Sequence, residues 1–98
     1  MYLKIHNNPS GKIVAVCDED LIGKVLENKD IYMDLDKYRG FYIGSLADQK
    51  KVMEALKGFE SANIVGTESV SIALSMGIIT KKDVMYIKKT PYIQIYKL

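Results

Sequence analysis

The first 17 residues carry a hairpin signal that constrains the fold more than any other feature of the chain. Residues 2–6 and 13–17 are rich in strand-forming residues, and their side chains fall into two alternating sets. This period of two is typical of strands, since successive side chains of a strand point to opposite faces of a sheet. The segment between them reads Asn-Asn-Pro-Ser-Gly, a turn composition, since proline fixes φ while Gly and Asn accept positive φ. We predict an antiparallel hairpin with His6 opposite Ile13 and Cys17 at the far end.

Downstream of the hairpin, short helical and strand patterns alternate. Apolar residues at helical spacing predict three helices. One follows Asp18 and ends near Leu26, one runs from a capping box at residues 45–48 to Gly58, and one runs from Gly66 to Gly77. Strands are predicted at residues 30–36, 41–43, 63–65, 84–89 and 92–98, the last two forming a hairpin across Thr90-Pro91. The order β-β-α-β-β-α-β-α-β-β predicts one α+β domain over residues 1–98, with helices on a mixed, mostly antiparallel sheet.

Composition excludes several classes of protein. The chain is 48% hydrophobic and 27% charged, as is ordinary for a globular domain. Its longest unbroken apolar run, Ile13–Cys17, is five residues long, whereas a membrane helix needs about 20. The first residues lack the basic-then-apolar layout of a secretion signal. We therefore expect a cytoplasmic protein with no membrane partner.

One cysteine and one histidine limit the chemistry of the chain. They exclude an internal disulfide, a cysteine-rich zinc site and a histidine cluster. In the predicted hairpin Cys17 and His6 lie about 13 Å apart, too far for a nucleophile–base pair. Cys17 is therefore interpreted as a packing residue. We expect no metal, no cofactor and a binding protein rather than an enzyme.

Three carboxylates share one face of the predicted strand at residues 30–36. Among them, Asp34 and Asp36 would lie about 7 Å apart, a spacing at which two carboxylates can flank Mg²⁺ or divide acid and base roles. The sequence supplies no further ligands in a recognisable pattern. A solvated acidic face is the favoured interpretation.

The C-terminal segment offers the most informative surface. Residues 67–98 contain five lysines and two acidic residues, which indicates a polyanionic partner. Tyrosine rings on a strand can stack on bases and lysines can contact phosphates, although tyrosine is also common in strands for packing alone. The candidate residues for binding a nucleic acid or a partner protein are Lys81, Lys82, Tyr86, Lys88, Lys89, Tyr92, Gln94, Tyr96 and Lys97.

The start of the third predicted helix is a candidate site for a small anion. Gly66, Thr67 and Ser69 offer backbone N–H groups and two hydroxyls, which can hold a phosphate or carboxylate. A single glycine without a nearby lysine is a poor phosphate loop, and Glu68 would repel an anion. Ordinary capping by Thr67 is the favoured alternative.

Three stretches of the chain form a family signature. They read Val-Ala-Val-Cys-Asp-Glu-Asp-Leu-Ile-Gly-Lys at residues 14–24, Ala-Asn-Ile-Val-Gly at 62–66 and Gly-Ile-Ile at 77–79. With Ala73, they resemble the archaeal domain-of-unknown-function family 424 over essentially the whole chain. The resemblance implies no established activity. Members often lie near translation genes in archaeal genomes, and the resemblance therefore implies an association with translation. Many members have histidine after the C-terminal proline, where this chain has Tyr92.

These features predict a small cytoplasmic binding domain associated with RNA or the translation apparatus. The alternative is a homodimer in which Tyr92–Tyr96, as an edge strand, pairs with its copy. A second alternative is an anion-binding protein or small-molecule enzyme with a concave site near Thr67. Salt-sensitive binding would indicate the RNA-associated domain, and a salt-independent dimer would indicate the homodimer. A pocket at Thr67 would indicate the anion-binding protein or enzyme.

Overall fold

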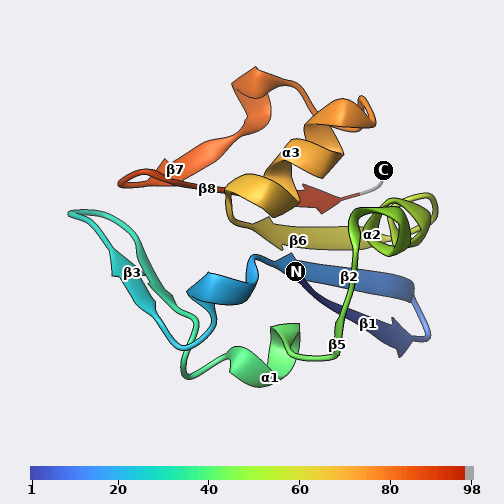
Figure 1. The fold of residues 1–98 in the computed structure, drawn as a ribbon, viewed down its shortest axis with the longest axis horizontal. Coiled ribbons are helices and arrows are strands. Elements are labelled where there is room, and N and C mark those ends of the chain that lie inside the picture. Colours follow the sequence, from blue (N-terminus) through green and yellow to red (C-terminus); the bar gives the residue numbers. More distant parts are fainter. Residues whose placement is uncertain (97–98) are drawn as a thin grey trace.

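A mixed six-stranded sheet runs through the centre of the protein, whose residues 1–96 are described by a computed structural model (Figure 1). Strands β2 and β6 are parallel, and the other neighbours in this sheet are antiparallel. With three α-helices packed around it, the sheet confirms the predicted mixed α+β class. In spatial order the strands are β5 (Ser45–Leu46), β1 (Tyr2–Asn8), β2 (Gly11–Cys17), β6 (Ser61–Val65), β8 (Thr90–Tyr96) and β7 (Met85–Ile87).

The N-terminal hairpin has the predicted register. Strands β1 and β2 pair along their whole length, with Cys17 opposite Tyr2 and His6 opposite Ile13. The side chain of Asn8 accepts a hydrogen bond from the backbone N–H two residues later, at 3.1 Å, which stabilises the turn as Asn side chains commonly do. Local turn chemistry was therefore sufficient to fix this pairing.

Helices α2 (Gln49–Ala55) and α3 (Thr67–Ser75) cover one face of the sheet. Helix α2 begins later than predicted, because the N-cap is Asp48, whose carboxylate accepts from the backbone N–H of Lys51 at 2.9 Å. Helix α3 ends as predicted before Gly77, which adopts a φ of 73°. The core between helices and sheet contains Val14, Val16, Val52, Leu56, Ala62, Ile64, Val70, Ile72, Ala73 and Ile93.

A second layer covers part of the opposite face. It consists of a two-stranded sheet, β3 (Val25–Glu27) and β4 (Tyr32–Asp34), followed by the one-turn helix α1 (Arg39–Tyr42). In Figure 1 this layer occupies the left and bottom of the view, away from α2 and α3. No helix within residues 1–96 has the length and apolar character needed to cross a membrane. The cluster beneath the layer contains Ala15, Cys17, Leu21, Leu35, Tyr42, Val65, Ile87 and Tyr92.

The predicted helix over residues 21–26 is wrong. A short 3-10 turn, Glu19–Leu21, is followed by strand β3. Gly23 adopts a φ of 92°, which a right-handed helix excludes, and its N–H donates to the carbonyl oxygen of Leu35 at 3.2 Å. Pairing with β4 thus outweighs the local helical spacing, since propensity is weak beside tertiary contacts.

Two other element predictions are also wrong. Residues 41–43 belong to the end of α1 and its cap rather than to a strand. The adjacent Phe41 and Tyr42 both pack in the cluster beneath the second layer. Adjacent residues of a strand would instead point to opposite faces of the sheet. The C-terminal hairpin turns at Lys88-Lys89 rather than at Thr90-Pro91, and Lys88 has a φ of 55°.

Candidate functional site

A hollow opens between the sheet and its second layer. It lies between the middle of strands β6 and β8 and the segment that leads from β4 into α1. Its volume is about 360 Å³, within the range of roughly 300–1,000 Å³ that is usual for small-ligand sites. The lining residues are Tyr32, Met33, Asp34, Leu35, Tyr38, Phe41, Tyr42, Asn63 and Gln94.

Two side-chain amides contribute to the sheet side of the hollow. Asn63 on β6 and Gln94 on β8 are direct cross-strand partners, so their side chains share a face and lie side by side. Neither amide forms a hydrogen bond with another residue of 1–96, and no side-chain polar atom in this part of the chain is both buried and unpaired. Both amides are therefore open to solvent and free to bind a ligand.

Aromatic rings form much of the remaining lining. Tyr32 and Tyr38 are 65% and 58% exposed, while Phe41 is half-buried and Tyr42 buried. Burial raises the pKa of Tyr42 to about 12, so its hydroxyl stays protonated at neutral pH. The hollow combines stacking surface with hydrogen-bonding groups.

Phe41 is held in place by the first strand. Its ring stacks on that of His6, with centroids 4.5 Å apart and planes inclined by 14°. Nε2 of His6 lies 2.9 Å from the carbonyl oxygen of Phe41, and Tyr42 packs against Phe41 edge-on at 5.1 Å. A four-residue helix is marginally stable by itself. The contacts of Phe41 with His6 on β1 therefore hold α1 in place at the side of the hollow.

The rim of the hollow carries a carboxylate. Oδ1 of Asp34 accepts hydrogen bonds from the backbone N–H groups of Asp36 and Lys37 at 3.0 and 2.8 Å. The hydroxyl of Tyr32 donates to Oδ2 at 3.3 Å. The hydrogen bond from Lys37 is the main cause that lowers the pKa of Asp34, and the negative charge of Asp34 raises the pKa of Tyr32. Asp34 is therefore ionised near neutral pH and accepts hydrogen bonds only.

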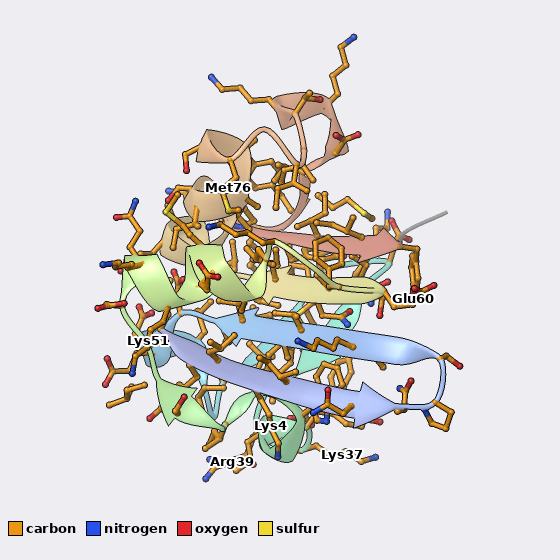
Figure 2. The ribbon with its side chains drawn as sticks, turned by 90° about the vertical axis from the view of Figure 1, so that its right-hand side faces the viewer. Lys4, Lys37, Arg39, Lys51, Glu60 and Met76 are labelled. Carbon is orange, nitrogen blue, oxygen red and sulfur yellow. The ribbon has the colours of Figure 1, made fainter. Side chains whose placement is uncertain are left out.

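Positive side chains surround α1. Figure 2 shows Lys4, Lys37 and Arg39 along the side of the molecule that α1 covers. Nζ of Lys37 lies 5.5 Å from the ring centroid of Tyr38, and Nζ of Lys4 donates to the carbonyl oxygen of Gly40 at 2.7 Å. Arg39 pairs with Asp36 at 2.7 Å. Because the charge of Arg39 is paired with Asp36, Lys4 and Lys37 supply the positive charge near the hollow.

The tyrosines predicted on the C-terminal hairpin do not form one row. Tyr96 is 69% exposed and Gln94 is exposed on the same face, but Tyr92 is only 9% exposed. It belongs to the buried cluster beneath the second layer, together with Leu35 and Tyr42, so its predicted role in binding is wrong. Tyr86 is opposite Pro91 and therefore points to the other face of the sheet.

The predicted lysines do not surround one patch either. Lys88 and Lys89 form the exposed turn between β7 and β8. Lys81 and Lys82 are exposed in a separate 3-10 turn, Lys81–Asp83, that follows α3. Figure 1 places this turn at the top of the view, on the α3 side. Lys97 lies outside the described residues.

Strand β8 is covered only in part on the side away from β6. It lies between β6 and β7 in the sheet, and the three-residue strand β7 pairs with it over residues 90–92. Of the predicted edge Tyr92–Tyr96, β7 therefore covers only Tyr92. Pairing of this strand with a second copy stays a prediction.

The predicted anion site at the start of α3 is already filled by a carboxylate of the protein. Oδ2 of Asp18 accepts from the backbone N–H of Glu68 at 3.0 Å, and Oδ1 accepts from the N–H and the hydroxyl of Ser69 at 2.8 and 2.6 Å. Both Asp18 and Ser69 are buried. A Cβ at Gly66 would collide with the Asp18 carboxyl group. The assignment of Gly66, Thr67 and Ser69 to a bound anion is therefore wrong.

Cys17 packs in the interior, as predicted. It is fully buried, and its thiol donates to the carbonyl oxygen of Asp18 at 3.4 Å. Burial, with the nearby charge of Asp18, raises the pKa of Cys17 to about 12. A thiol in this state is a poor nucleophile at neutral pH.

Sequence reasoning missed most of the residues that line the hollow. Asn63 gives a weak signal, as a polar residue inside an otherwise apolar strand. Tyr32 falls within the predicted acidic strand at residues 30–36, and Tyr38 lies outside every predicted element. Asp18 was assigned to the helix that follows it in sequence rather than to α3, which begins about 50 residues later. These placements depend on contacts between distant segments.

The protein is thus an α+β domain with a mixed sheet and an aromatic hollow that contains two amides and a carboxylate. It belongs to the family described as "Protein of unknown function (DUF424)", which matches residues 5–98. A similar solved structure is that of an uncharacterized conserved protein from Methanopyrus kandleri, with 26% sequence identity and a TM-score of 0.81 over 99% of this chain and 90% of that chain. No curated protein matches the chain.

Proposed function

We propose that the protein binds single-stranded RNA through the side of the sheet that contains the hollow. The observation that carries this proposal is the combination of exposed tyrosine rings with two free amides, Asn63 and Gln94. Base–aromatic stacking contributes about 1–3 kcal/mol per base. Bases can reach such a surface when they are unpaired, because pairing conceals their hydrogen-bonding edges.

The surface extends beyond the hollow along β8. Tyr96 lies two residues from Gln94 on the same face, about 7 Å away along a strand. Its exposed ring provides a platform for a neighbouring base. Gln94 and Tyr96, both expected from the sequence, thus keep their roles, while Tyr32 and Tyr38 take the place of Tyr92.

Phosphate contacts are assigned to lysines on two flanks. Lys37 lies beside Tyr38 near the hollow, and Lys88 and Lys89 lie exposed at the β7–β8 turn. The net charge is only +2, so we expect moderate affinity that falls as salt rises, since binding releases counterions from the RNA. RNA of the translation apparatus in the cytoplasm is the expected target.

The first test is the fluorescence anisotropy of labelled single-stranded RNA with three tyrosine variants. Tyr38→Ala and Tyr96→Ala should each weaken binding roughly 5- to 100-fold, from the loss of one stacking platform. Tyr86→Ala is the matched control, because Tyr86 is 57% exposed but lies on the other face. Equal effects of all three variants, or no binding by the wild type, would contradict the proposal.

A capture experiment tests the translation link. The tagged protein should retain ribosomal or transfer RNA from lysate, and nuclease treatment should release it. The variant with Tyr38→Ala and Tyr96→Ala provides the control for adhesion through other surfaces. Capture that survives nuclease and is equal for both proteins would argue against an RNA partner.

A second copy of the chain is the alternative partner. It is favoured by Met85 and Tyr86, which are both exposed on the edge strand β7, where an unpaired edge can accept another strand. Light scattering should then show a dimer at every salt concentration, and Met85→Lys should dissociate it. A monomer at all concentrations would exclude the dimer.

A further inference from the structure

The size of the hollow limits its occupant to a small planar group. Its volume of about 360 Å³ is near the lower end of small-ligand sites. Three aromatic residues, Tyr32, Tyr38 and Phe41, line it, and aromatic rings bind flat groups best by offset stacking or edge contacts. One nucleobase fits this description, whereas a stack of several bases does not.

The two amides specify hydrogen-bonding groups on that occupant. Each amide offers two N–H donors and a carbonyl acceptor, and neither Asn63 nor Gln94 is engaged by another residue of 1–96. An apolar occupant would remove these groups from water without replacing their hydrogen bonds, which is unfavourable. The occupant therefore carries donors and acceptors along one edge, as a base does.

The carboxylate of Asp34 adds a preference among bases. Its Oδ1 already accepts two backbone hydrogen bonds, while Oδ2 accepts one from the hydroxyl of Tyr32. An ionised carboxylate has about four lone-pair sites, so Oδ2 retains one acceptor position. Amino groups of adenine, cytosine and guanine satisfy such an acceptor. Uracil offers only its N3–H, which is flanked on both sides by carbonyl oxygens that the carboxylate repels.

We infer that the hollow holds one unstacked base of the RNA and selects bases with an exocyclic amino group over uracil, through Asn63, Gln94 and Asp34. This inference rests on the proposed function and names the part of the RNA that the hollow reads. The negative rim directs the phosphates away from Asp34 and toward Lys37, which lies over the outer tyrosine ring. Tyr96 binds a neighbouring base by stacking, without selection.

The experiment compares four RNA strands that differ at one position. Each strand is an oligouridine, and the central base is U, A, C or G. The strands with A, C or G should bind roughly 5- to 10-fold more tightly than the all-U strand, because one well-made contact to a base edge discriminates by this order. Equal affinity for the four strands would overturn base selection while leaving RNA binding intact. Absence of binding to every strand would overturn the proposed function itself.

Asp34→Asn provides the sharpest variant. Its amide oxygen can still accept from the backbone at residues 36 and 37, while its NH₂ group replaces the acceptor at Oδ2 with a donor. The preference should shift toward uracil, whose carbonyl oxygens accept hydrogen bonds. An unchanged preference in a folded Asp34→Asn protein would overturn the role of Asp34.

Gln94→Ala tests the amides at an exposed position, where substitutions usually change stability little. It should reduce discrimination among the four strands to about twofold or less, because one reading group is lost. Tyr96→Ala is the control and should lower affinity for all four strands by the same factor. A Gln94→Ala protein that keeps the full preference would overturn base reading by the amide pair. A second readout is the side-chain amide NMR signals of Asn63 and Gln94, which should move at a lower concentration of cytidine monophosphate than of uridine monophosphate.

Discussion

Asp18 shows how much one side chain can determine at the residue scale. Its carboxylate accepts three hydrogen bonds from Glu68 and Ser69 and so takes the place of an N-cap, which α3 lacks at Gly66. A carboxylate at this position also complements the positive end of the helix. Because Gly66 has a φ of 111° and no room for a Cβ beside Asp18, the two residues form a matched pair.

We expect Asp18→Ala to lower the free energy of unfolding by about 3 kcal/mol, because the buried N–H and hydroxyl donors lose a charged acceptor. Urea denaturation followed by circular dichroism measures this change. Asp48→Ala is the control, since Asp48 caps α2 at an exposed position, and it should cost about 1 kcal/mol. If Asp18→Ala lowers the free energy of unfolding no more than Asp48→Ala does, the buried cap stabilises its helix no more than an exposed one.

Cys17 makes stability depend on alkaline pH. Burial raises the pKa of its thiol from the ordinary value of 9.0 to about 12. Below pH 9 the thiol is neutral in both the folded and the unfolded protein. Above pH 9 the thiol of the unfolded chain loses its proton while that of the folded protein keeps it. Stability should therefore fall as the pH rises from about 9 towards 12, by up to about 1.4 kcal/mol per pH unit.

Denaturation between pH 9 and pH 10 reports mainly on the thiol, because the ordinary pKa of tyrosine, 10.0, lies above that of cysteine, 9.0. Cys17→Ala should lack most of this slope. Alkylation of the wild type at pH 8 should proceed only as fast as the chain opens, because the thiol is fully buried. Rapid labelling of the folded protein would contradict this account.

At the element scale, the sequence predicted the parts of the fold that local signals determine. The hairpin at residues 2–17, strand β6 and helix α3 follow from turn residues, alternation and a glycine at the helix end. The second layer could not be predicted in this way. Residues around Gly23 become extended only because β4 pairs with them, and α1 is helical because two adjacent aromatic residues must reach the same sheet.

The short helix α1 depends on Phe41, and we expect Phe41→Ala to destabilise the protein by about 2 kcal/mol through lost packing against His6. It should also speed hydrogen exchange over residues 38–43. Tyr38→Ala provides the control, because its exposed ring should contribute less than 0.5 kcal/mol to stability, as is typical of surface positions. If both variants lose similar stability, the stack of Phe41 on His6 does not hold α1 in place.

The candidate site could be predicted only in part, because it is assembled from three distant segments of the chain. Gln94 and Tyr96 were found from strand alternation in a basic region. Asn63 joins them only through the pairing of β6 with β8, and Tyr38 only through the fold of the second layer. No spacing rule in the sequence links these positions.

At the scale of the whole molecule, the division of lysines between two sides predicts unequal effects of charge reversal. Lys88→Glu with Lys89→Glu should weaken RNA binding and lower the slope of log affinity against log salt by about 2, one for each phosphate contact. Lys81→Glu with Lys82→Glu is the matched control, because these lysines follow α3 on the opposite side. Anisotropy titrations at several salt concentrations measure both. Identical slopes for the two variants would show that only net charge matters.

The single parallel pair, β2 with β6, joins two halves of the sheet that are each built from neighbouring segments of the chain. The hydrogen bond from Asp18 N–H to the Val65 carbonyl oxygen, at 3.0 Å, extends this junction to the start of α3. Closing the junction brings together residues 50 positions apart, and such distant encounters slow folding. We expect formation of this junction to be a slow step of folding, so the residues that secure it shorten the time during which a newly made chain is open to aggregation.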